Sequence, residues 1–173
     1  MPNPIATLFL SLVLVACAAP TQQGAAATTP ASTVPAQSGT PGALRAALAL
    51  VGHRWRLVDA RDAGGRRIDA LFVREDKPLH LDFNASLVSI GNGCGTMSAH
   101  HALTGDSLTV EPMATLPGAC TDKALLALDR EIGNRLQGRL AMRIDEGDAP
   151  TLVLTNAAGD VLTFNGMAES EPL

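Results

Sequence analysis

The chain has 173 residues, of which 46% are hydrophobic and 3% aromatic, and its formal net charge at pH 7 is −4. Every charged side chain follows Gly42, so residues 43–173 form one small acidic domain, large enough to bury a single core. Nucleic acid or an anionic membrane face would call for a basic patch, which the mildly acidic, mixed charge argues against. The scarcity of aromatic residues argues against a stacking platform for bases or sugars.

Residues 1–16 predict a lipoprotein signal peptide. The apolar run at residues 5–16 is too short to cross a bilayer and is typical of a signal-peptide core. It ends in Leu14-Val15-Ala16-Cys17, which matches a lipobox, so we expect Cys17 to carry the lipid anchor. Ala18 is not an acidic residue of the kind associated with inner-membrane retention, which favours the periplasmic face of the outer membrane. An ordinary secretory signal with a chance cysteine is the alternative.

Residues 17–42 predict a lipidated cysteine followed by a flexible tether. The stretch after Cys17 is rich in Ala, Thr and Pro, carries no charge and has Val34 as its only large aliphatic residue. Such a composition buries too little apolar surface to offset the entropy of ordering the chain. As a flexible coil it would span roughly 25–30 Å and hold the domain clear of the lipid headgroups.

The domain predicts a mainly β (α+β) fold made of short strands separated by turn residues. Leu79, Leu81 and Phe83 alternate with polar residues and are expected to point inward. Most turns between successive expected strands are only a few residues long, and such short connections join antiparallel neighbours. Strands are expected at residues 55–58, 67–73, 79–83, 87–90, 97–103, 107–110, 139–144, 151–154 and 161–164.

One helix is expected to interrupt the strands. Thr121 is the predicted N-cap, Asp122 suits the positive end of the helix dipole, and Gly138 ends the helix. A further short helical turn is expected at residues 43–51. The apolar stripe at helical spacing consists of Leu125, Leu128, Ile132 and Leu136.

A set of glycine, cysteine and histidine residues resembles the motif of the META domain family, which includes the HslJ-type heat-inducible lipoproteins. The resemblance covers residues 44–166, although Gly95 stands where the family usually has Asn and His101 where it has Tyr. It implies a small antiparallel barrel-like sheet with one packed helix, and an envelope protein linked to stress tolerance. The matching residues are Gly93, Cys94, Gly95, His101, Gly105 and Cys120.

Once Cys17 carries lipid, Cys94 and Cys120 remain as an even pair in an oxidising compartment, which favours a disulfide. Such a bridge would stabilise the fold by about 3–4 kcal/mol through loop entropy. Two buried thiols that pack as small hydrophobic side chains are the alternative. A redox-active pair is a weaker one, because the Cys-x-x-Cys spacing is missing.

No catalytic motif is present, so we expect a protein that is not an enzyme and that needs no cofactor or metal. His100 and His101 are neighbours on an expected strand and therefore point to opposite faces. The acidic stretch at residues 145–148 lacks the Gly and distal Glu of a calcium loop and is expected to be a solvated turn.

Two functional hypotheses follow. The first is a non-catalytic envelope protein, anchored in the outer membrane, that supports envelope stress tolerance or membrane integrity by contacting another protein. An inhibitor of a periplasmic hydrolase is a variant of it, with residues 116–118 as the inserting loop. The alternative is a barrel that binds a small ligand in its interior.

Overall fold

The computed structural model describes residues 41–116 and 120–167. The predicted signal peptide, Cys17 and nearly all of the predicted tether lie outside the described residues. The first helix starts at Pro41, two residues before the expected start of the domain. None of the helices in the described ranges has the length and apolar character that crossing a membrane requires.

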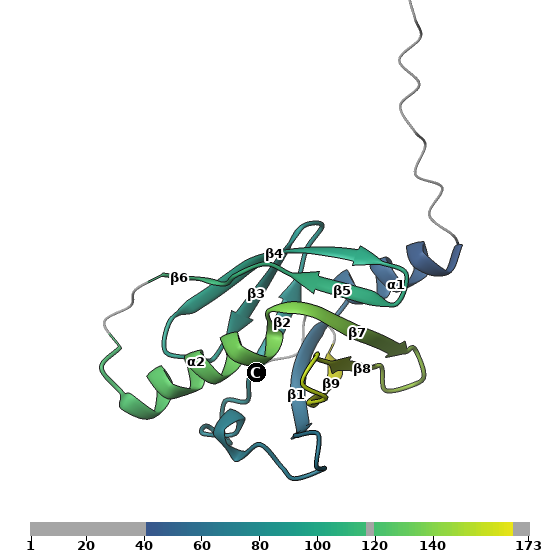
Figure 1. Ribbon diagram of the computed structural model, residues 1–173. Helices are drawn as coiled ribbons and strands as arrows, with labels where there is room; N and C mark the ends of the chain where they lie inside the picture. Colours follow the sequence, from purple (N-terminus) through teal and green to yellow (C-terminus); the bar gives the residue numbers. More distant parts are fainter. Residues whose placement is uncertain (1–40, 117–119, 168–173) are drawn as a thin grey trace, which may run out of the picture. The chain divides into compact units, whose positions relative to one another are not determined.

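The described residues form one antiparallel sheet, and eight of its strands close into a barrel (Figure 1). The prediction of a mainly β, barrel-like fold is therefore confirmed. The strands are β1 (Arg54–Arg61), β2 (His80–Phe83), β3 (Leu87–Gly91), β4 (Thr96–Thr104), β5 (Ser107–Val110), β6 (Ala114–Leu116), β7 (Gly138–Asp145), β8 (Thr151–Thr155) and β9 (Val161–Met167).

The barrel is a meander in which the strands pair in chain order and the last strand returns to the first. β9 pairs with β1 from Arg54↔Met167 to Arg61↔Val161, with a bulge between Leu57 and Asp59. β6 stands apart, because it pairs with the start of β4, beyond the stretch of β4 that pairs with β5. The connection from β5 to β7 contains β6 and the long helix, yet these two strands pair directly.

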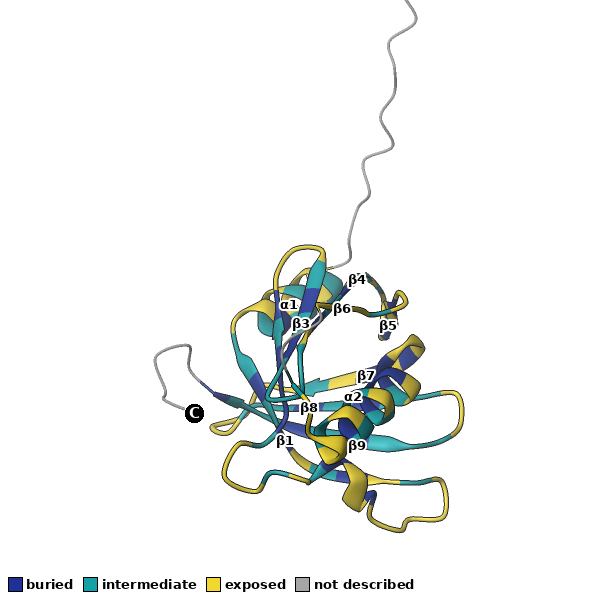
Figure 2. Cartoon of the chain, turned by 90° about the vertical axis from the view of Figure 1, so that its left-hand side faces the viewer, coloured by how far each residue is buried: buried dark blue, intermediate teal, exposed yellow. Residues whose placement is uncertain are grey.

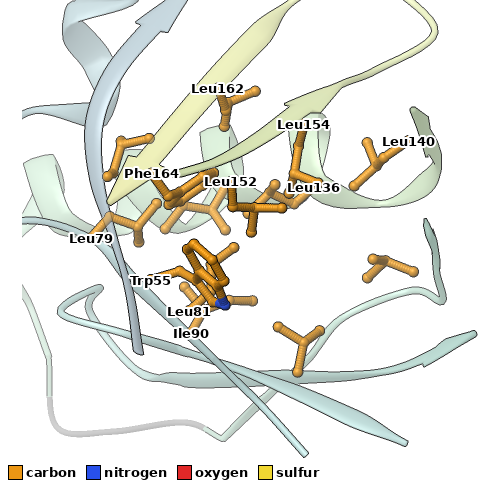
Figure 3. Packing of buried hydrophobic residues seen from close by; sticks show 14 of the residues in the cluster. Trp55, Leu79, Leu81, Ile90, Leu136, Leu140, Leu152, Leu154, Leu162 and Phe164 are labelled. Atoms are coloured by element: carbon orange, nitrogen blue, oxygen red, sulfur yellow. The ribbon is translucent and has the colours of Figure 1, made fainter. Parts of the chain in front are cut away.

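Alternate residues of the eight barrel strands fill the barrel interior with aliphatic and aromatic side chains. Leu79, Leu81 and Phe83 are all buried, as their alternation predicts. Figure 3 shows side chains from several strands meeting around Trp55 and Phe164. The hollow left among eight of these side chains, Met113 and Leu136 of the long helix has a volume of only about 10 Å³, which is about the space of a single water molecule.

Helix α2 (Lys123–Leu136) covers one end of the barrel. Leu128, Ile132 and Leu136 are buried, and Leu136 reaches the interior side chains. The N-cap is Asp122 rather than the predicted Thr121: its carboxylate accepts hydrogen bonds from the backbone N–H groups of Ala124 and Leu125. Colouring by burial shows dark blue and yellow faces along this helix (Figure 2).

Helix α1 (Pro41–Val51) covers the opposite end, where the sequence predicts only a short helical turn. It contacts β2, β4 and β7, which are not neighbours in the sheet, so it lies over an open end of the barrel. The buried Trp55 indole donates a hydrogen bond to the carbonyl of Leu50, at 2.9 Å, and fastens the helix to β1.

The expected strand at residues 67–73 is wrong. The segment makes one isolated bridge, Arg61↔Arg67, and then a 3₁₀ turn, η1 (Asp69–Leu71). Ile68 and Leu71 are both buried, and their spacing of three residues suits a 3₁₀ turn rather than the alternation of a strand. The strand β6, in turn, is one that the sequence analysis did not predict.

Candidate functional site

The loop between β3 and β4, at residues 92–95, lies at the barrel end that α2 covers. Asn92 begins the turn with a φ of 70° and donates a hydrogen bond from its side chain to the carbonyl of Pro78, at 2.8 Å. A Cβ on Gly93 would collide with the carboxylate of Asp129, and one on Gly95 would lie 2.8 Å from the carbonyl oxygen of Leu116. Both positions therefore need glycine for close packing.

A disulfide joins Cys94 to Cys120, with the two Cα atoms 5.6 Å apart. It ties the β3–β4 loop at residues 92–95, which we call the glycine loop, to the segment that leads into α2. The structure thus contains the bridge that the sequence favours.

Asp129 of α2 also holds this loop. Its two carboxylate oxygens accept hydrogen bonds from the backbone N–H groups of Cys94, at 2.8 Å, and of Gly95, at 3.2 Å. Hydrogen bonds to an ionised acceptor are stronger than neutral ones. The loop is therefore fixed covalently at Cys94 and electrostatically from the helix.

Leu116, at the end of β6, is the most exposed of the large hydrophobic residues described, at 69%. It is the register partner of Thr96, directly after the glycine loop. The remainder of the predicted inserting loop, Pro117 and Gly118, lies outside the described residues. Leu116 thus stands exposed beside a loop that the disulfide and Asp129 hold in place.

A polar hollow of about 620 Å³ adjoins this loop on the outer wall of β2 and β3. Its lining combines the cationic side chains of Arg74 and Lys77 with polar groups of the strands and the backbone of residues 91–95. Leu116 also lines it. The hollow and Leu116 together form a mixed polar and apolar surface, which we call the loop face.

His80 lies in the wall of this hollow and is only 8% exposed. Its ring occupies the space above Gly91, its partner across the β2–β3 ladder, where a Cβ would collide with it. Asp82 Oδ2 is 3.3 Å from His80 Nε2, and Asp82 Oδ1 accepts a hydrogen bond from Arg54 at 2.8 Å.

Burial lowers the pKa of His80 below its ordinary value of 6.5 and outweighs the opposing effect of Asp82, while Arg54 lowers it further. The imidazole is therefore neutral at neutral pH. With Asp82 already paired to Arg54, the positive charges of Arg74 and Lys77 dominate the lining of the hollow.

The residues of the family motif do not form one site. Gly93, Cys94, Gly95 and Cys120 come together at the loop face, whereas His101 and Gly105 lie toward the α1 end of the barrel. His101 Nε2 is 2.9 Å from the carbonyl oxygen of Asn84, and its ring packs edge-on against Phe83. Gly105 occupies the β4–β5 turn with a φ of 61°.

Across residues 41–116 and 120–167, no group of three or more His, Cys, Asp or Glu side chains is placed to hold a metal ion. His100 is exposed and His101 half-buried on β4. The acidic stretch at residues 145–148 forms an exposed turn, in which Asp145 accepts a hydrogen bond from the backbone of Gly147.

The sequence analysis missed Asp129 and the group formed by Arg54, His80 and Asp82. A signal for Asp129 was available, because an acidic residue at this position falls within the apolar stripe of α2, four residues after Leu125 and three before Ile132. The other group arises from pairing between β1 and β2, which brings together residues far apart in the sequence.

Fold and site together define a small antiparallel β-barrel domain with a disulfide-bonded loop at one end. The chain belongs to the META domain family, whose model matches residues 47–169. No curated protein matches the chain.

Among solved structures, the chain is similar to a protein from Burkholderia xenovorans determined by NMR. The two share 19% identity over 86% of this chain and 98% of that chain, with a TM-score of 0.56, which is a likeness of fold. A DUF4847 family protein from Bacteroides vulgatus is more distant. It has 13% identity and a TM-score of 0.46, over 70% of this chain and 96% of that chain.

The disulfide should stabilise the domain measurably. The two cysteines are 26 residues apart, and the double variant C94A/C120A is expected to lose about 3–4 kcal/mol of unfolding free energy, because the unfolded chain regains loop entropy. Urea unfolding of both proteins, with and without a reductant, measures this difference. A reductant should destabilise the wild type and leave the variant unchanged; equal stability of the two oxidised proteins would contradict the prediction.

The lowered pKa of His80 should make stability fall in mild acid. Below about pH 6.5 the unfolded state takes up a proton that the folded state resists, so the free energy of unfolding decreases as the pH drops from about 7 to about 5. In H80Q this part of the pH dependence should vanish, whereas the exposed His100, changed in H100Q, serves as the control. Parallel pH curves for the wild type and H80Q in urea unfolding would contradict the assignment.

Proposed function

We propose that this META domain protein is a non-catalytic lipoprotein of the periplasm, anchored in the outer membrane through Cys17. In this proposal it supports envelope stress tolerance or membrane integrity by binding another protein. The lipobox and the uncharged stretch before the domain support the anchor. With an anchor of several acyl chains, attachment would be effectively permanent.

The observation that carries the proposal is the exposure of Leu116 on the loop face. Leaving a large aliphatic side chain in water is unfavourable by about 1.5–3 kcal/mol compared with burying it. The disulfide and Asp129 hold the neighbouring loop in place, so little conformational entropy is lost when a partner covers Leu116. The cationic lining contributed by Arg74 and Lys77 favours a partner with acidic groups opposite the hollow.

Inhibition of a periplasmic hydrolase remains a form of this proposal, with residues 116–118 as the inserting loop, of which Leu116 is exposed. The alternative is a protein that binds a small ligand, but the site cannot be the barrel interior that the sequence analysis expected. The hollow among the interior side chains measures only about 10 Å³, so a ligand would have to bind on the outside of the barrel, where the hollow of the loop face, about 620 Å³, is the strongest candidate. Its lining would select an anionic ligand.

Position 116 should contact a partner in the cell. A photo-crosslinking p-benzoyl-phenylalanine at position 116 is expected to give a discrete crosslinked species in intact envelopes, because Leu116 is exposed on the loop face. The matched control is position 126 on α2, where Leu126 is also exposed. Mass spectrometry of the excised species identifies the partner. The same products at both positions, or none at 116, would count against protein binding through this face.

The anchor has its own test. The N-terminal peptide of protein isolated from bacterial envelopes should begin at Cys17 and carry the mass of acyl chains, and C17S should move the chain out of the outer-membrane fraction. An unmodified Cys17 in the isolated protein would remove the anchor from the proposal without affecting the loop face.

A further inference from the structure

Helix α1 has an apolar face that the barrel does not cover. Leu44 and Leu48 are each 61% exposed and Val51 is 43% exposed. Spacings of four and three residues place them on one side of the helix, and we call them the α1 stripe. The buried Leu50 faces the barrel instead.

A surface helix normally presents polar side chains to water. This one is apolar on the barrel side and on the outer side, and Arg45 is its only charged residue. Beside the stripe, Leu48 and Val51 line a largely apolar hollow of about 390 Å³, together with Leu50, Ala102 and Leu103. The exposed apolar surface therefore continues from the helix onto β4, which is typical of a surface that another body covers.

The position of α1 in the chain indicates what covers it. Only residues 18–40 separate the proposed lipid on Cys17 from the start of the helix at Pro41. A chain of this length reaches at most about 80 Å even when fully extended. The apolar helix is thus the first described element after the anchor, and it lies at the barrel end opposite the loop face.

We propose that the α1 stripe lies on the bilayer that holds the acyl chains of Cys17, with Leu44, Leu48 and Val51 turned toward the lipid. This inference rests on the proposed anchor. It orients the domain so that the α1 end faces the membrane and the loop face, with Leu116, points into the periplasm.

The charges near the helix bear on the kind of lipid. Arg45 shares a surface hollow with the acidic residues Asp106 and Glu146, so this end of the barrel has no excess of positive charge among the residues that line it. The contact therefore depends on apolar area rather than on attraction to anionic headgroups. Vesicles of uncharged phosphatidylcholine are a sufficient test surface.

The test attaches the chain from Cys17 onward, through the thiol of Cys17, to a maleimide lipid in phosphatidylcholine vesicles with brominated acyl chains. Coupling is selective because Cys94 and Cys120 are joined in the disulfide. L48W places an indole in the α1 stripe, and L126W places one on α2 at the opposite end. The native Trp55 is fully buried and supplies a constant background.

We expect L48W to lose a large part of its added emission in brominated vesicles, and L126W to lose none. Adding L44S and V51S to L48W should restore the emission. Equal quenching of L48W and L126W, or none in either, would overturn the proposal. So would a blue shift of L48W emission on concentration without vesicles, which would assign the stripe to a second copy of the chain.

Because the coupling is chemical, the result does not depend on whether a cell lipidates Cys17. The mass of the N-terminal peptide from envelopes reports separately on the anchor. If L48W is quenched but Cys17 from envelopes carries no lipid, the membrane contact of the α1 stripe is supported and the anchor is refuted. If Cys17 carries lipid but L48W is not quenched, the anchor is supported and the membrane contact is refuted.

Discussion

The pairing of β9 with β1 is the constraint on which the rest of the structure depends. It joins strands from opposite ends of the domain over seven residue pairs and turns an open meander into a closed barrel. Without it, both strands would present unpaired backbone edges to solvent. Closure also buries Trp55 and Phe164 completely, so the interior becomes a packed core rather than a one-sided sheet.

Closure also creates two distinct ends. Connections in a meander alternate between the ends, so the β3–β4 loop and the β8–β9 turn lie together beneath α2. Asp129 holds the loop, and Arg135 Nε lies 3.5 Å from Asp160 in the turn. The other end carries α1, fastened through Trp55. The proposed partner surface and the proposed membrane surface therefore lie on opposite sides of one rigid core, so that neither contact obstructs the other.

Several independent contacts hold the loop at residues 92–95 in one conformation. Gly93 and Gly95 permit the approach of Asp129 and Leu116, the carboxylate satisfies two backbone N–H groups, and the disulfide fixes the loop to the start of α2. Each of these contacts stabilises the same conformation of the loop, so the exposed Leu116 lies beside backbone that is held in place. Preorganisation of this kind lowers the entropy lost on binding.

The sequence by itself determined those strands and helices whose apolar residues repeat with a regular local spacing. Alternation placed Leu79, Leu81 and Phe83 inside, and helical spacing located α2, because burial on one face imposes the period of the element. Resemblance supplied the barrel and the family, and the even pair of cysteines, in the oxidising compartment that the lipobox predicts, favoured the disulfide. Residues 67–73 were misjudged because a short apolar run satisfies both a strand and a 3₁₀ turn.

Only the tertiary structure decided what depends on contacts between distant segments. Strand register places the ring of His80 over Gly91 and keeps His101 away from the loop face. Barrel closure brings the Asp129 carboxylate to the backbone N–H of Cys94 and leaves the α1 stripe exposed. Periodicity indicates which face of an element is apolar, but whether that face is covered depends on which elements the closed barrel brings against it.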